Sequence, residues 1–124
     1  MAKRIDKVDD DSDYPIVHIF KGQRYIVLKD YYIERTKPTI RVCYRIGCWN
    51  HKPPKFETRF ERYDKHGRRW KPVKNQGLVE SQLRIVGKIL PVVIKDLRKY
   101  TKLHTTGELQ WLLRKDLEEK IKGE

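Results

Sequence analysis

The chain has 124 residues and a formal net charge of +12 at pH 7, with 37% charged and 38% hydrophobic residues. This length is that of one domain with a core of modest size. The excess of cations favours a polyanionic partner. No apolar run approaches the roughly 18–20 residues of a membrane span. Two cysteines and no hydrophobic leader predict an intracellular protein without a disulfide framework.

The positive charge is concentrated in residues 37–74. This segment holds twelve Lys and Arg against three acids, which accounts for +9 of the total +12. Charge concentrated in one part of a predicted sheet indicates a binding face; a role in solubility alone is the alternative.

Residues 1–14 alternate bases with an acidic cluster at 9–13 and contain almost nothing to bury. They predict a disordered charged tail. An acidic arm that competes with nucleic acid for a basic groove is the alternative. Residues 15–124 are predicted to form a single nucleic-acid-binding domain.

The first half of that domain predicts antiparallel strands. Residues 16–20 and 24–28 flank a short turn that contains Gly22, which is typical of a hairpin. An extension of the second run to residue 33 is the alternative to its end at residue 28. In the next strand, residues 39–49, a period of two places Arg41 and Arg45 on one face. Gly47 in that strand predicts a bulge or a close backbone approach.

A second hairpin is predicted over residues 55–77. Its first strand, 56–63, leads to a turn at 64–67 in which we expect Gly67 to take a positive φ. The chain returns through residues 68–71 and is stopped by Pro72. Both faces of the first strand contain an arginine and an aromatic ring, so alternation does not decide which face meets solvent. Cations and rings together suit a single-stranded nucleic acid.

The second half predicts helices. Residues 77–80 are expected to form a short strand or the end of one, and Ser81 is the expected N-cap of an amphipathic helix. Pro91 lies inside its apolar pattern and predicts a kink near Leu90 or an end there. The apolar stripe is wider than one sheet face can cover, which favours a homodimer contact. A C-terminal helix is predicted over 106–121, with a cap at Thr105 or Thr106.

A set of residues in the second hairpin and the following loop resembles the positive cofactor four family of transcriptional coactivators, which bind single-stranded DNA. The matching positions are Arg59, Tyr63, Asp64, Gly67, Lys71, Pro72, Lys74, Gly77 and Leu78. Trp49-Asn50 and Pro54-Lys55 are also similar to bacterial members. The resemblance covers about residues 37–98. The loop 71–77 is one residue longer than the usual pattern and lacks its glycine after Lys-Pro.

This resemblance implies an α+β fold: a curved antiparallel β-sheet of four or more strands, a kinked amphipathic helix and dimeric assembly. The additional C-terminal helix, predicted from its apolar stripe, lies outside the family's domain. It implies binding of single-stranded DNA, with little sequence preference, in transcription, replication or repair. The family's contacts fall on Arg59, Trp70, Lys71 and Lys74. The other predicted contacts are cations of the neighbouring strands and turn: Arg41, Arg45, Lys55, Arg62, Arg68 and Arg69. For Trp70, a buried core position is the alternative.

Other functions remain open at this point. The chain could bind RNA or duplex DNA, or act on a polymerase through its C-terminal helix. Zinc binding by Cys43, Cys48 and His51, with His66 as a further candidate ligand, is disfavoured, because the spacing of the first three fits no common structural site. Glu57 and Glu61 share a strand face but are explained by ion pairing with arginines. We therefore predict neither catalysis nor a cofactor nor a metal.

Overall fold

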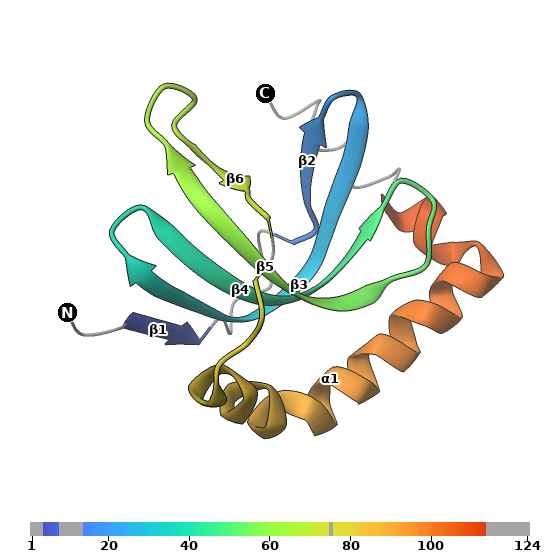
Figure 1. The fold of residues 1–124 in the computed structure, drawn as a ribbon. Coiled ribbons are helices and arrows are strands. Elements are labelled where there is room, and N and C mark those ends of the chain that lie inside the picture. Colours follow the sequence, from blue (N-terminus) through green and yellow to red (C-terminus); the bar gives the residue numbers. More distant parts are fainter. Residues whose placement is uncertain (1–3, 8–13, 75, 114–124) are drawn as a thin grey trace.

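The computed structural model describes residues 4–7, 14–74 and 76–113 of the 124. They form one antiparallel sheet and a long helix, so the predicted α+β fold is confirmed (Figure 1). The sheet curls into an open half-barrel, and the helix runs along its outer, convex side. The elements are β1 (Arg4–Lys7), β2 (Ile16–Phe20), β3 (Gln23–Lys37), β4 (Ile40–Trp49), β5 (Lys55–Asp64), β6 (Arg69–Pro72) and α1 (Glu80–Thr106).

The long strand β3 organises the sheet. One of its edges pairs with β4, and its other edge is shared by β2 and β1. The turn between β2 and β3 places Lys21 at φ 50° and Gly22 at φ 78°, which confirms the predicted hairpin. Three register shifts interrupt the pairing of β3 with β4. Because bulges increase local twist, these shifts help to curl the sheet.

Strand β1 corrects the prediction that residues 1–14 are a tail without structure. Its four residues pair antiparallel with residues 32–35 of β3. The prediction was based on the scarcity of apolar side chains, but backbone groups alone can pair with an open strand edge. Residues 1–3 and 8–13, which include the acidic cluster, lie outside the described residues.

The second hairpin is formed by β5 and β6, as predicted, but its turn has a different geometry. The positive φ belongs to Arg68, at 51°, and not to Gly67. A Cβ added to Gly67 would lie 2.9 Å from Oδ2 of Asp64. Oδ1 of the same carboxylate accepts a hydrogen bond from the backbone N–H of His66 at 3.1 Å. A side chain at position 67 would therefore displace the Asp64 carboxylate from this position.

The hydrophobic core lies between the convex face of the sheet and the helical part of the chain. Alternate side chains of β4 and β5 point toward it, and α1 contributes two fully buried residues, Ile89 and Val93. The sheet residues in this core are Ile26, Leu28, Tyr31, Val42, Tyr44, Ile46, Cys48 and Phe60. Because strand side chains alternate, Arg41, Cys43 and Arg45 of β4 lie on the opposite, concave face.

The start of α1 differs from the prediction. Val79 is the N-cap and Glu80 the first helical residue, so Ser81 is not the cap and no strand covers residues 77–80. The Val79 N–H donates to Oε1 of Gln82 at 3.0 Å. Nε2 of Gln82 donates to the buried Glu34 carboxylate at 3.3 Å. The glutamine thus supplies half of a capping box and ties the helix to β3.

The helix does not end at Pro91 but continues to Thr106. Gly107, at φ 83°, closes it with its N–H bonded to the carbonyl of His104 at 3.1 Å, an αL C-cap. Residues 108–113 are helical again, and their Leu109 and Leu113 are buried. The rest of the predicted 106–121 helix lies outside the described residues.

Candidate nucleic-acid interface

The concave face of the sheet has three closely bonded charged side chains at its centre, which we call the ion-pair block: Asp30, Arg45 and Glu61. Their exposed fractions are 3%, 2% and 4%. The Arg45 guanidinium donates from Nε to Oδ1 of Asp30 at 2.6 Å and from Nη2 to Oδ2 at 3.3 Å. Its Nη1 donates to Oε2 of Glu61 at 3.3 Å. Oε1 of Glu61 also accepts a hydrogen bond from Nε of Arg41 at 2.8 Å.

The charges of the ion-pair block hold one another in place. Burial alone acts to raise the pKa of Glu61, but Arg45 and Arg41 outweigh it and lower that pKa. Burial likewise acts to lower the pKa of Arg45, yet the net direction is upward because anionic groups surround it. A buried charge is tolerated only when it is paired in this way.

Burial therefore removes Arg45 from the set of predicted ligand contacts. Its donors face Asp30 and Glu61, and its side chain has almost no exposed surface. The period of two in β4 correctly predicts that Arg45 shares a face with Arg41. It does not indicate that acids from the two neighbouring strands enclose Arg45.

One group of aromatic and basic side chains lies toward the β5–β6 hairpin; we call it the Trp70 stack. Trp70 pairs with Tyr63 across the hairpin, with ring centroids 5.4 Å apart. The Arg41 guanidinium lies 4.3 Å and that of Arg35 lies 5.4 Å from the Trp70 ring centroid. Trp70 is half-buried and Arg35 is exposed. The ring is thus oriented by cation–π contacts and is not sealed in the core.

A second group, the Trp49 stack, lies at the other end of the same face. The rings of Trp49 and Tyr25 are 4.8 Å apart. The Arg59 guanidinium lies 5.3 Å from the Tyr25 centroid and 6.0 Å from that of Trp49. Tyr25 donates its hydroxyl to Oε2 of Glu57 at 2.7 Å. A Cβ on Gly47 would lie 2.6 Å from the Tyr25 hydroxyl oxygen, so the predicted close approach at Gly47 is made by this ring.

The remaining predicted contacts surround these stacks without forming one cluster. Lys55 is exposed and shares the strand face of Arg59. Lys71 pairs in register with Arg62, on the side of the ribbon away from Trp70, and its Nζ lies 2.8 Å from Asp64. The other exposed cations lie in the turn, on β6 and after it: Arg68, Arg69 and Lys74.

Two side chains from the β2 side adjoin the ion-pair block. Tyr14 donates its hydroxyl to Oδ2 of Asp30 at 2.7 Å. Burial is the main cause that lowers the pKa of His18, with Glu61 opposing and Arg45 reinforcing the effect. Neither residue was among the predicted site residues. Tyr14 precedes the predicted domain, and His18 lies in a strand that was interpreted only as part of a hairpin.

Sequence reasoning also missed Tyr25 and Arg35 and did not place Trp49 among the contacts. Tyr25 and Arg35 lie near opposite ends of β3. The pairing of β3 with β4 places Tyr25 opposite Trp49 and Arg35 opposite Arg41, and both arginines lie near the Trp70 ring. The sequence does contain a signal, since aromatic and basic residues recur along residues 24–35. Its meaning depends on how β3 pairs with the neighbouring strands, which the sequence does not specify.

The two cysteines lie on opposite faces of β4, and both are buried free thiols. Burial raises the pKa of Cys43 to about 12 and that of Cys48 to about 11. Such thiols are poor nucleophiles. Among residues 4–7, 14–74 and 76–113, no three His, Cys, Asp or Glu side chains gather as a metal site would require.

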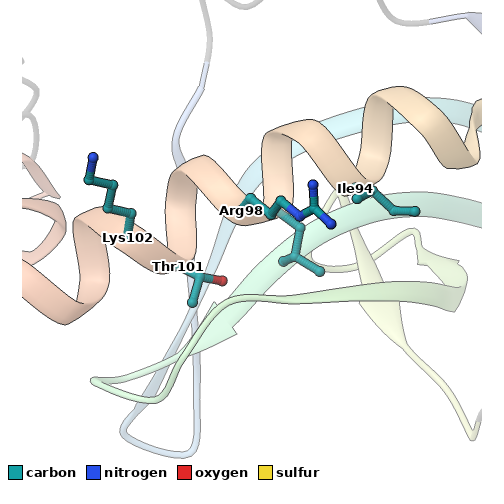
Figure 2. A pocket seen from close by; sticks show the side chains of 5 residues that line it. Ile94, Arg98, Thr101 and Lys102 are labelled. Atoms are coloured by element: carbon teal, nitrogen blue, oxygen red, sulfur yellow. The ribbon is translucent and has the colours of Figure 1, made fainter.

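A second surface feature is an apolar stripe along α1, which we define as Leu83, Leu90 and Ile94. Their exposed fractions are 55%, 44% and 41%. The stripe leads to a cavity of about 480 Å³. Figure 2 shows that side chains of α1 line it, with the Arg98 guanidinium beside Ile94 and the Lys102 ammonium pointing away from Ile94. These lining residues are Ile94, Leu97, Arg98, Thr101 and Lys102.

Comparison of the chain with protein-family models, curated proteins and solved structures finds no match. The resemblance to the positive cofactor four family therefore depends on the motif residues. No helix in the described part of the chain is long and apolar enough to cross a membrane.

Proposed function

We propose that the chain binds single-stranded DNA, with little sequence preference, on the concave face of its sheet, in the manner of the positive cofactor four family. One observation supports this most: two tryptophans on this face are each covered by arginine and backed by tyrosine. Stacking accepts any base, because every base has a π-face. The binding is non-catalytic, takes place inside the cell and serves transcription, replication or repair.

The basic segment supplies the affinity that does not depend on sequence. Most of the chain's net charge falls in residues 37–74, which span β4, β5 and β6. Lys55 and the turn cation Arg68 are exposed and suited to phosphates. Neutralising phosphates releases counterions, so the affinity should fall steeply as salt rises.

The ring geometry favours an unpaired strand over a duplex. A half-buried Trp49 or Trp70 can stack only on a base that is free of its partner. Duplex DNA would meet the cations alone. RNA shares the stackable bases, so a single-stranded RNA oligonucleotide is the informative competitor.

We propose further that the chain forms a homodimer through the apolar stripe of α1. The exposed fractions of Leu83, Leu90 and Ile94 exceed 40%, and such a row is a common helix-packing surface. Gly87 lies within the same stretch, and a Cβ there would meet nothing within 4 Å. A glycine in a helix interior is unfavourable, and here it would let a second helix approach closely.

The test is a fluorescence anisotropy titration with three 12-mers: single-stranded DNA, the same sequence as duplex, and single-stranded RNA. Trp70→Ala should weaken single-strand binding by about 5-fold to 150-fold. Trp111→Ala serves as the matched control, since this tryptophan is 62% exposed and lies in the helical segment 108–113. Equal loss in both variants, or no binding by the unmodified chain, would contradict the proposal.

Trp111→Ala also addresses the rival role as a protein-interaction module. Deleting residues 105–124 would be a poor test, because Leu109 and Leu113 belong to the core. Exposed Trp111 and Leu112 are the residues through which that role would act. Unchanged function of the Trp111 variant in a polymerase-dependent assay would argue against it.

A further inference from the structure

We propose that a bound single strand is gripped at two separate points, the Trp70 stack and the Trp49 stack, and passes over the ion-pair block between them without base contact. This inference depends on the proposed function and adds the length and the base requirement of the ligand. It predicts a minimum oligonucleotide length and a central stretch whose bases are not needed.

Each stack is ordered in the free protein. Arg41 lies 4.3 Å from the Trp70 centroid and is itself held by Glu61 at 2.8 Å. The exposed Arg35 lies 5.4 Å from the same ring. A base can replace this guanidinium at the ring or stack beside it. In the other stack, Tyr25 is fixed by its hydrogen bond to Glu57. Stacking platforms prepared in this way lose little freedom when a base arrives.

The spacing of the stacks follows from the strands. Arg41 lies below Trp70, and Gly47 lies below Tyr25. These two residues are six positions apart on β4, or about 20 Å at 3.3 Å per residue. A single strand stacked as in B-DNA rises about 3.4 Å per nucleotide. About six steps therefore connect the stacks, and fewer if the strand is extended.

The surface between the stacks is unsuited to reading a base. Arg45, Asp30 and Glu61 are almost fully buried, and the Arg45 donors are directed at the two carboxylates. The Tyr14 hydroxyl is bonded to Asp30. A base over this block would gain neither an open ring nor an uncommitted guanidinium.

The first test is a length series of deoxythymidine oligonucleotides of two to twelve nucleotides, with the full chain. Binding at a second point is intramolecular once the first is occupied, so affinity should rise by about tenfold or more over a narrow range of lengths. That range should lie between about three and eight nucleotides. Trp49→Ala and Trp70→Ala should each abolish the rise, whereas Lys95→Ala, which removes an exposed cation of α1, should preserve it.

The second test uses eight-nucleotide strands in which abasic sites replace either the four central bases or the two bases at each end. The central replacement should leave the affinity within about threefold, because the phosphates remain. The terminal replacement should weaken binding by at least about fivefold. If central and terminal replacements weaken binding equally, the two-point inference is overturned while the proposed function stands. If the unmodified strand does not bind, the proposed function itself fails.

Discussion

The guanidinium of Arg45 lies between the carboxylates of Asp30 and Glu61, and all three side chains are buried. Removing the cation would leave Glu61 paired only with Arg41 among the described cations, and would leave the buried Asp30 with the Tyr14 hydroxyl but without its cation. We expect Arg45→Ala to lower the free energy of unfolding by about 3–5 kcal/mol. Denaturant unfolding measures this, with Arg62→Ala as the control, since Arg62 is exposed and its loss should cost within about 0.5 kcal/mol. Equal effects in the two variants would contradict the structural role.

His18 should make stability depend on pH. Burial is the largest cause that lowers its pKa in the folded state, whereas the unfolded value is about 6.5. Between these two values the unfolded chain binds more protons, so the His18 contribution is complete above about pH 6.5 and is lost as pH falls through the folded pKa. We expect His18→Gln to lose less stability than the unmodified chain between about pH 7.5 and 5.5. Identical pH profiles of the melting temperature would refute this.

At the scale of elements, the junction between β3 and α1 depends on Gln82. Its amide joins the Val79 N–H to the buried Glu34 carboxylate. Gln82→Ala should destabilise the fold by about 1–3 kcal/mol, because it leaves a buried acceptor without that donor. Ser81→Ala, at the exposed position that the sequence suggested as the cap, should cost less than about 0.5 kcal/mol. Thermal unfolding of both variants decides between the two caps, and a larger cost at Ser81 would favour the sequence-based assignment.

Most strands could be predicted because their signals are local. The period of two in β4 and the Gly22 turn each specify a strand or hairpin within a few residues. β1 could not be predicted in this way, since its partner is the far half of β3, 25 to 31 residues along the chain. The same limit applies to the site: the roles of Arg45 and Arg35 depend on which strands become neighbours, and that depends on register.

At the scale of the whole molecule, the proposed dimer makes a prediction about the apolar stripe of α1. Leu90→Lys places a charge at a position that is 44% exposed, so the fold should tolerate it while a helix–helix contact should not. Analytical ultracentrifugation should find a dimer for the unmodified chain and a monomer for this variant, with unchanged circular dichroism. Thr105→Lys, near the end of α1 and exposed, is the control. A monomer in every sample would rule out the dimer.

The proposed function depends on which face of the sheet binds the ligand. α1 covers the convex side of the sheet, while the two stacks and the ion-pair block lie on the concave side. Period and composition could not decide between these faces, because both faces of β5 contain an arginine and an aromatic ring. The packing of Ile89 and Val93 against the sheet shows that α1 covers the convex side.

The most direct test compares the affinity for a 12-nucleotide single strand and its duplex at 50 and 200 mM salt, in the unmodified chain and in the Trp49→Ala, Trp70→Ala double variant. We predict tighter binding of the single strand. If about four cations contact phosphates, its affinity should fall about 50-fold between the two salt concentrations. The double variant should lose the preference for the single strand. Equal affinity for both forms, unchanged by the loss of the two tryptophans, would contradict the account.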